Sequence, residues 1–263
     1  MYQQLQIIPK IAPLVINAGK MMLLREKNPD FETKINLRDK VTKFDKAIQK
    51  YLIGELKKLF PNASFVGEEG DQKSAVNPYK GEVFIIDPID GTSNFIAGLN
   101  YSAVSVGYVK DGTVVAGSVY NPFTNEHFYA EKGLGSYLNG EKITVNEDDL
   151  SKGMVVFGTA VYYDDTIEKT KRCFCEMLSK CNDLRRMGAA SLDICSVAAG
   201  RFCGFFECRL CPYDYCGAQI ILQEAGGIIS DFNGNPVSLS NYSSVVCGNK
   251  KCYDKLRQII NNA

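Results

Sequence analysis

Five acidic residues stand where the chain is predicted to leave a strand or enter a helix. Glu68 and Glu69 follow a short apolar segment, Asp87 and Asp90 follow the unbroken apolar run at 83–86, and Asp214 precedes an apolar helical pattern. Carboxylates in such positions are the side chains from which proteins build sites for hard cations. The search for chemistry therefore begins with these acids.

The central pair lies in the segment Asp87-Pro88-Ile89-Asp90-Gly91-Thr92. Pro88 fixes one backbone angle and removes an N–H donor, and Gly91 permits a turn that is closed to other residues. Thr92 is predicted to open a helix, whose free N–H groups and dipole favour an anion such as phosphate. The segment thus places two carboxylates beside an anion-binding position.

This arrangement of like charges requires a cation. Two carboxylates about 4 Å apart repel by roughly 4 kcal/mol at an effective dielectric constant near 20. Ligands that are all oxygen select hard ions, magnesium first, with calcium or manganese as competitors. The sequence predicts a magnesium site.

Some of these acids also have a purely structural interpretation. Asp45 could be only the capping-box partner of Thr42, because Thr-x-x-Asp is a common helix start. Asp214 could be an N-cap residue, and Glu68-Glu69 taken alone would be a solvated turn. From the residues alone these alternatives stay open.

Histidine and cysteine chemistry is weakly supported. The single histidine, His127, follows a turn and is expected to be a partly exposed strand residue, so a Ser-His or Cys-His hydrolase has no good base. All ten cysteines lie between Cys173 and Cys252, and we interpret them as small buried hydrophobes in a reducing compartment. Cys208-x-x-Cys211 could indicate zinc, but the spacing favours packing.

The elements that position the acids follow from periodicity. Helices are predicted at 5–25, 45–60, 165–181, 191–199, 215–225 and 253–260, and strands at 64–66, 83–86, 154–157, 202–207 and 245–247. Turn signals between 102 and 145 predict an antiparallel meander.

The bulk composition is that of an ordinary globular chain. Of 263 residues, 45% are apolar and 23% charged, with 30 basic and 30 acidic side chains. No net charge draws the chain to nucleic acid or anionic lipid, and no apolar run is long enough to span a bilayer. We expect a soluble cytoplasmic protein without a membrane or nucleic-acid partner.

Three motifs resemble one known family. Gly67-Glu68-Glu69, the segment from Asp87 to Phe95 and Tyr213-Asp214 are similar to those of the inositol monophosphatase family, in order and spacing, from about residue 34 to residue 227. The resemblance implies an α+β fold, a layered αβαβα sandwich of the inositol monophosphatase and fructose-1,6-bisphosphatase type. We expect subdomains at 1–145, with most of the metal-binding acids, and 146–263, with the last aspartate and the substrate pocket.

The resemblance also implies metal ligands and catalytic residues. Two to three magnesium ions are expected, with manganese as an alternative. Ligands of the first metal would be Glu68, Asp87 and the Ile89 carbonyl, and ligands of the second Asp87, Asp90 and Asp214. Glu69 and Asp45 would touch a weaker third site or its waters. Thr92, with Asp45 behind it, would orient and deprotonate the attacking water, and Glu68 is counted with these catalytic residues.

Further residues are expected to meet the substrate. The N–H groups of Gly91 and Thr92 would hold phosphate, near Lys34, although Lys34 could also be an ordinary surface lysine. The alcohol half of the substrate would meet Asp90, Gly188, Ala190 and Glu207, with Thr159 on a weaker alignment. The family usually has a tryptophan before the last aspartate, where this chain has Tyr213, which leaves the catalytic residues intact and puts the substrate in question.

The implied function is metal-dependent hydrolysis of a small phosphate monoester by activated water. Thr92-Ser93-Asn94-Phe95 favours myo-inositol monophosphate as substrate. Fructose-1,6-bisphosphatase activity, 3′-phosphonucleotide phosphatase activity and a non-catalytic metal-binding regulatory role are the alternatives. The family resemblance further implies a homodimer and inhibition by lithium.

Overall fold

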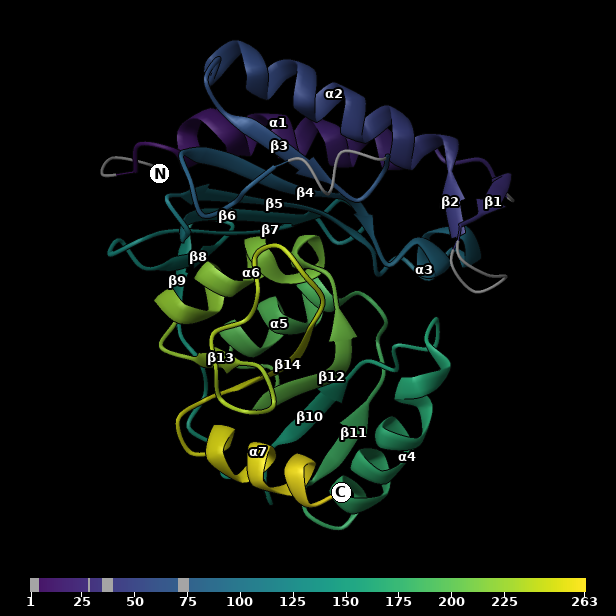
Figure 1. The fold of residues 1–263 in the computed structure, drawn as a ribbon, viewed down its shortest axis with the longest axis vertical. Helices are drawn as coiled ribbons and strands as arrows, with labels where there is room; N and C mark the ends of the chain where they lie inside the picture. Colours follow the sequence, from purple (N-terminus) through teal and green to yellow (C-terminus); the bar gives the residue numbers. More distant parts are fainter. Residues whose placement is uncertain (1–4, 28, 35–39, 71–75) are drawn as a thin grey trace.

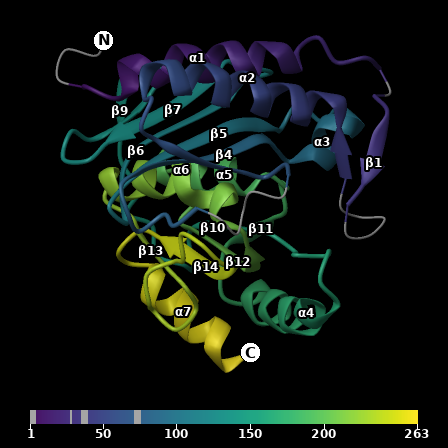
Figure 2. The ribbon, with the colours of Figure 1, turned by 45° about the horizontal axis from the view of Figure 1, so that its top comes forward.

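Helices and sheets alternate in five layers along the long axis of the molecule (Figure 1). The computed structural model describes residues 5–27, 29–34, 40–70 and 76–263. Helices α1 (Ile8–Met22) and α2 (Lys43–Leu59) cover the outer face of a seven-stranded sheet, and α5 (Ala190–Ala198) and α6 (Pro212–Glu224) lie between the two sheets. Helices α4 (Asp164–Leu178) and α7 (Tyr253–Asn262) cover the far side of a five-stranded sheet. The turned view shows the same order of layers (Figure 2). The predicted αβαβα sandwich is confirmed.

The seven-stranded sheet is a meander built onto one parallel pair. Its strands, in spatial and chain order, are β3 (Ser64–Gly67), β4 (Glu82–Asp90), β5 (Ala103–Lys110), β6 (Thr113–Asn121), β7 (Glu126–Glu131), β8 (Ser136–Leu138) and β9 (Glu141–Ile143). Only β3 and β4 pair in parallel, and every later pair is antiparallel. Because β3 and β4 are parallel and Gly67 pairs with Ile86, Glu68, which follows β3, comes beside Asp87 in β4.

The five-stranded sheet has the order β11-β10-β12-β14-β13. Its strands are β10 (Met154–Phe157), β11 (Asp183–Arg185), β12 (Gly204–Leu210), β13 (Ile228–Ser230) and β14 (Ser243–Gly248). Strands β11, β10 and β12 are parallel, and β14 is antiparallel to both of its neighbours. A small separate hairpin pairs β1 (Phe31–Thr33) with β2 (Lys40–Thr42), and the short helix α3 (Thr92–Ala97) follows β4.

Burial explains the sequence patterns of the helices. The outer helices α1 and α2 bury one stripe against the sheet, as their spacing predicted. Every residue of α5 is buried, since this helix has a sheet on each side. Three apolar clusters fill the spaces between the layers. One of them surrounds the inner helices and reaches both sheets, so the N–H donors to Asp90 and the helix that carries Asp214 stand on a packed core.

The structure differs from the sequence-based expectations in several elements. The strand predicted at 83–86 continues to Asp90, and the helix predicted at 215–225 begins at Pro212, so Asp214 lies inside its first turn. The strands β1, β2, β11 and β13 were not predicted. The proposed division at residue 145 stays a prediction.

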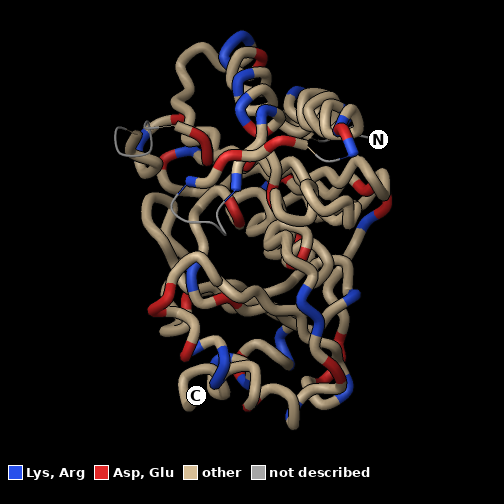
Figure 3. Tube along the Cα trace, turned by 90° about the vertical axis from the view of Figure 1, so that its right-hand side faces the viewer, with Lys and Arg blue, Asp and Glu red and all other residues tan. Residues whose placement is uncertain are grey.

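Basic and acidic residues are mixed along the chain, as their equal numbers suggest. Figure 3 shows lysine and arginine interspersed with aspartate and glutamate along the chain. Among the described residues, no helix is long and apolar enough to cross a membrane.

Candidate metal-dependent active site

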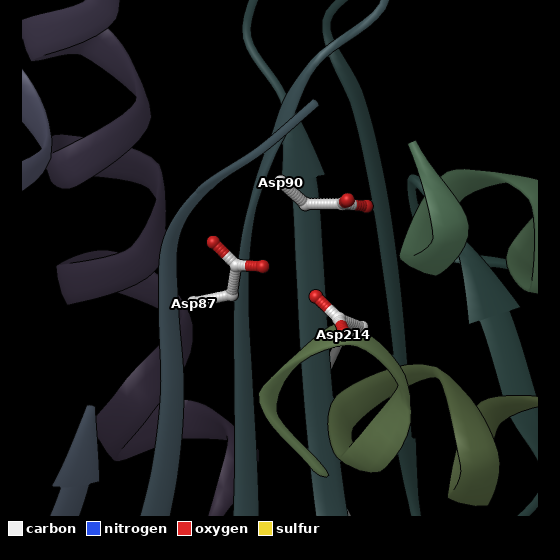
Figure 4. A group of neighbouring side chains, drawn as sticks. All are labelled: Asp87, Asp90 and Asp214. Atoms are coloured by element: carbon white, nitrogen blue, oxygen red, sulfur yellow. The ribbon is translucent and has the colours of Figure 1, made fainter. Parts of the chain in front are cut away.

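Asp87, Asp90 and Asp214 point toward one another at the junction of the two halves of the chain (Figure 4). Each offers one carboxylate oxygen, and the three oxygens lie within 4.8 Å of one another. The first two come from the end of β4 and the third from the first turn of α6, so residues more than a hundred positions apart form one cluster. Among the described residues, this is the group of histidine, cysteine and acidic side chains with the spacing of a metal site.

A bulge at the end of β4 directs both aspartates to the same place. The pairing register with β5 shifts between Asp87 and Asp90, and the Ile89 N–H donates to Asp87 Oδ1 at 3.0 Å. Without the bulge, residues three positions apart in a strand would point to opposite faces. Gly91 then turns the chain with φ of 81°, and a β-carbon there would lie 3.0 Å from the Ala189 side chain. Glycine is therefore required at this position.

Asp90 joins the strand end to the start of α5. Its carboxylate accepts hydrogen bonds from the N–H groups of Ala190 at 3.1 Å and Ser191 at 2.7 Å, and from the Ser191 hydroxyl. These donors, which lie about a hundred residues later in the chain, hold both carboxylate oxygens in place. Asp90 is 6% exposed, so its orientation is set by the protein.

Asp214 has a structural role as well as a place in the cluster. It accepts a hydrogen bond from the Cys211 N–H at 2.6 Å, as the third residue of α6 in a capping box with Cys211. The N-cap interpretation for Asp214 was wrong, because the N-cap residue is Cys211. The capping box leaves the side chain directed at the other two aspartates (Figure 4).

Burial and mutual repulsion shape the protonation of the three acids. Burial raises the pKa of Asp87 well above its usual value, and the charges of Glu68, Asp90 and Asp214 add to this. Burial likewise raises the pKa of Asp214, with Asp90 and Glu68 adding to it, and raises the pKa of Asp90 to about 6. A divalent cation would remove this repulsion. The donor set is entirely oxygen, with Asp87 and Asp90 buried and Asp214 half-buried, which fits a hard cation such as Mg²⁺.

Glu68 and Glu69 lie beside this cluster and are paired with Lys34. The Lys34 ammonium group contacts Glu68 Oε1 at 2.7 Å and Glu69 Oε1 at 2.5 Å. Burial acts to lower the pKa of Lys34, and the two carboxylates outweigh it and raise that pKa. The side-chain amide of Gln49 donates a hydrogen bond to the Glu69 carbonyl oxygen and accepts one from the Glu69 N–H. The roles of Glu68 and Glu69 at the metals and of Lys34 at phosphate stay predictions, but all three line the same pocket.

Half-buried Thr92 and buried Asp45 form a pair next to the cluster. Thr92 Oγ lies 3.3 Å from Asp45 Oδ1 and 3.0 Å from the Ile89 carbonyl oxygen. Asp45 is fully buried and completes the capping box of α2 with Thr42, whereas its role behind Thr92 stays a prediction. Burial raises the pKa of Asp45 to about 7. A carboxylate of this kind can exchange a proton near neutral pH.

A cavity of about 420 Å³ connects the acids to the predicted substrate residues. Besides the acids it is lined by the other residues singled out from the sequence, namely Ile89, Gly91, Thr92, Thr159, Gly188, Ala190 and Glu207. Glu207 is buried, accepts a hydrogen bond from the Ala160 N–H at 2.9 Å, and has its pKa raised by burial to about 7. The helix α3 has only six residues, so phosphate binding by the Gly91 and Thr92 N–H groups depends on local geometry more than on a helix dipole.

Several residues of this cavity were not found from the sequence. They are Asp193, whose carboxylate accepts a hydrogen bond from the Tyr101 hydroxyl at 2.9 Å, and Arg186, Arg209, Tyr163 and Tyr242. Arg209 carried no signal in the sequence, because it lies beyond the strand predicted at 202–207 and next to the irregular pairing between Glu207 and Leu210.

His127 does not line the cavity, and among the cysteines Cys211 alone lines it. His127 is 5% exposed, and Ser118 Oγ lies 2.8 Å from its Nε2, so the expectation of a partly exposed residue was wrong: the β7 segment is buried beneath its neighbours. Burial lowers the pKa of His127 to about 4. The ten cysteines are free thiols and six of them are buried. No zinc-type grouping occurs among the described residues.

Comparisons with known proteins agree with this geometry. The sequence model of the inositol monophosphatase family matches residues 6–263. Over 250 residues the chain is 34% identical to a fructose-1,6-bisphosphatase/inositol-1-monophosphatase of Thermotoga maritima, covering 94% of this chain and 93% of the relative. It is 33% identical to a Nus factor SuhB of Pseudomonas aeruginosa, covering 83% of this chain and 82% of that one.

A solved structure gives the same result for the fold. The inositol monophosphate-bound structure of an inositol monophosphatase from Staphylococcus aureus superimposes with a TM-score of 0.81 at 27% sequence identity, covering 96% of this chain and 92% of that chain. Relatives of this fold thus carry different names, and one of them has been seen with a phosphorylated polyol.

Proposed function

Because this chain is a phosphatase of the inositol monophosphatase family, we propose that it hydrolyses myo-inositol monophosphate with Mg²⁺ held by Asp87, Asp90 and Asp214. The observation that carries the proposal is the cluster of three carboxylate oxygens within 4.8 Å of one another, in one pocket with Thr92. Glu68 and the Ile89 carbonyl complete the proposed ligand set, and Glu69 lies beside it. When bound, such cations supply Lewis-acid stabilisation of phosphate charge and a lowered pKa of water.

The protein's own residues would position the reactants and move one proton. Thr92 Oγ lies within hydrogen-bond reach of Asp45, so the hydroxyl can accept a proton from water while passing its own to that carboxylate. Asp45, with a pKa near 7, is suited to receive it. Gly91, Thr92 and Lys34 would hold the phosphate, and Gly188, Ala190, Glu207 and Asp90 the hydroxyl groups of the polyol.

The assembly, location and inhibition of the protein belong to the same proposal. We infer a cytoplasmic homodimer that is inhibited by lithium and uses two to three Mg²⁺ ions, with Mn²⁺ as a substitute. The support is the membership of the family and the composition of the chain. The name Nus factor applies to relatives, and the basic and acidic residues that alternate along this chain give no separate argument for nucleic acid (Figure 3).

The test is phosphate release from a panel of esters. Initial rates would be measured with myo-inositol 1-phosphate, fructose 1,6-bisphosphate, 2′-AMP, and adenosine 3′,5′-bisphosphate, each with Mg²⁺ and again with excess EDTA. We expect Mg²⁺-dependent release from myo-inositol 1-phosphate. Release from another ester alone would keep the mechanism and replace the substrate. No release from any ester would favour the non-catalytic metal-binding alternative.

A further inference from the structure

Asp90 is held by more hydrogen-bond donors than the other two aspartates of the cluster. Its Oδ1 atom accepts a hydrogen bond from the Ala190 N–H at 3.1 Å, and its Oδ2 atom accepts two from Ser191, one from the N–H at 2.7 Å and one from the hydroxyl. Among the described residues, Asp87 and Asp214 each accept one hydrogen bond from an N–H group. The Ser191 hydroxyl is therefore a donor of a kind that these two acids lack.

The start of α5 accounts for the two N–H donors but not for the hydroxyl. The N-cap residue Ala189 makes no side-chain hydrogen bond to the first N–H groups of the helix, so the Asp90 carboxylate accepts from them in its place. Ser191 is fully buried and is not among the residues that line the cavity. Its hydroxyl therefore acts on Asp90 and not on a substrate.

These donors decide how much of Asp90 is open to a cation. An ionised carboxylate has about two acceptor positions on each oxygen. Ser191 occupies both positions of Oδ2, whereas Oδ1 has the Ala190 N–H as its donor and keeps one position. Asp90 can therefore offer a cation one oxygen, although carboxylates in general bind cations through either one or two.

The number of oxygens offered affects the choice of cation. Ca²⁺ takes about six to eight oxygen ligands at about 2.3–2.6 Å and accepts both oxygens of one carboxylate. Mg²⁺ is smaller and requires a nearly ideal octahedron of ligands at about 2.0–2.1 Å. An aspartate that is limited to one oxygen suits the octahedron and leaves the larger ion short of a ligand.

We propose that Ser191 is a positioning residue whose hydroxyl restricts Asp90 to one-oxygen coordination and thereby favours Mg²⁺ over Ca²⁺ at the acid cluster. This inference rests on the proposed function, because it concerns the same cation, and it adds a residue that determines which cation the site accepts. Without this hydroxyl, Oδ2 regains one acceptor position, and Asp90 can bind a larger cation through both oxygens.

The test replaces Ser191 by alanine, which keeps both N–H donors to Asp90 and removes the hydroxyl alone. Mn²⁺ bound to the full chain would be displaced with Mg²⁺ or with Ca²⁺, and the electron paramagnetic resonance signal of the released Mn²⁺ would give the Kd of each competitor. We expect the Kd for Ca²⁺ divided by the Kd for Mg²⁺ to be about three- to tenfold lower in Ser191→Ala than in the unaltered protein, as for loss of one hydrogen bond to a metal ligand.

A second measurement does not depend on the stability of the variant. Crystals of the unaltered protein grown with Ca²⁺ should show one Asp90 oxygen within about 2.6 Å of the ion, and crystals of Ser191→Ala should show two. Ser196→Ala is the matched control, because Ser196 is a second buried serine of α5 and does not donate to Asp90. Either alanine variant can lower the free energy of unfolding, but Ser196→Ala should leave the ratio of the two Kd values unchanged.

The outcomes distinguish this inference from the proposed function. The same Kd ratio in Ser191→Ala as in the unaltered protein would overturn the role of Ser191 while the metal site stands. Two Asp90 oxygens on the Ca²⁺ ion in the unaltered protein would do the same. Failure of the unaltered protein to bind Mn²⁺ would overturn the proposed metal site, and with it the proposed function.

Discussion

The two ends of the pocket hold their charged side chains by different means. At the acidic end, Asp87, Asp90 and Asp214 accept hydrogen bonds from backbone N–H groups of a strand end and two helix starts. At the basic end, Arg209 is held by two aromatic side chains, one of them 45% exposed. The backbone fixes the acids, whereas aromatic side chains fix the arginine.

The difference teaches where chemistry and specificity reside in this fold. An acid that is held by backbone N–H groups keeps its position only if the local backbone keeps its conformation. The turn at Gly91 is an example, because few residues other than glycine adopt it. Aromatic stacking on Arg209 depends only on nearby rings, and can be gained or lost by single substitutions. We therefore expect changes at the acidic end to abolish the reaction and changes at the basic end to alter its substrates.

The largest effect is expected from Asp87→Asn. The amide removes a charged ligand common to both proposed metal positions, so kcat at saturating Mg²⁺ should fall at least about 10³-fold for every substrate. Steady-state kinetics of phosphate release would measure this. Asp254→Asn, an exposed aspartate in the first turn of α7, is the matched control and should leave kcat unchanged. Full Mg²⁺-dependent activity in Asp87→Asn would refute the ligand assignment.

The next effect is expected from Thr92→Val, which keeps the shape of the side chain and removes its hydroxyl. The contact to Asp45 is lost, so kcat should fall about 10²-fold while the Mg²⁺ concentration for half-maximal rate stays nearly constant. Thr113→Val, at an exposed strand start, serves for comparison. A large shift in the Mg²⁺ requirement would instead make Thr92 part of the metal site.

An effect on stability follows from the raised pKa values. The folded-state pKa is about 7 for Asp45 and for Glu207, above the ordinary values near 4, so their stabilising contribution is complete below pH 4 and is lost as the pH rises through 7. His127, with a pKa near 4, changes little above pH 6.5. The melting temperature of the metal-free protein should therefore fall between pH 6.5 and 8, by about 2–4 °C per kcal/mol lost.

Added Mg²⁺ should change this pH dependence of the melting temperature. A cation at the acid cluster favours the ionised carboxylates, so Mg²⁺ should raise the melting temperature more at pH 8 than at pH 6.5. Scanning calorimetry at both pH values would record it. A melting temperature of the metal-free protein that rises from pH 6.5 to 8 would contradict the raised pKa values.

The smallest effect is expected from Tyr242→Leu, which removes one ring beside Arg209. A partly exposed cation–π contact contributes about 0.5–1 kcal/mol, so the free energy of unfolding should fall by about that amount and kcat/KM for phosphate release should change less than about twofold. Urea unfolding and steady-state kinetics measure the two quantities. A fall in kcat/KM of more than about tenfold would show that the ring itself contacts the substrate.

The same contrast explains what the sequence could reveal. The strand at 83–86 and the acids after it could be predicted from the sequence, because a strand buried on both faces and the turn residues that follow it have characteristic local sequences. The bulge through which β4 continues to Asp90 could not be predicted, since it depends on pairing with β5. The hairpin β1–β2 was missed because its first strand is three exposed residues, without the alternation that marks a half-buried strand.

The basic end of the pocket was hidden for a similar reason. Arg209 meets Tyr163 and Tyr242 only through the tertiary fold, and no motif spacing links these three positions. Asp193 lies within the helix predicted at 191–199, where its position alone did not distinguish it. The acids, in contrast, each stand in a local motif, and the cavity contains all of them except Asp45, which lies behind Thr92.

The central claim is that Asp87, Asp90 and Asp214 hold a divalent cation. Anomalous X-ray scattering from crystals grown with Mn²⁺ tests it most directly, because the ion is located without reference to activity. We predict a peak between the three carboxylates, about 2.0–2.3 Å from an oxygen of each, and no such peak in Asp87→Asn crystals. Absence of the peak in the unaltered protein at a Mn²⁺ concentration that supports hydrolysis would contradict the account.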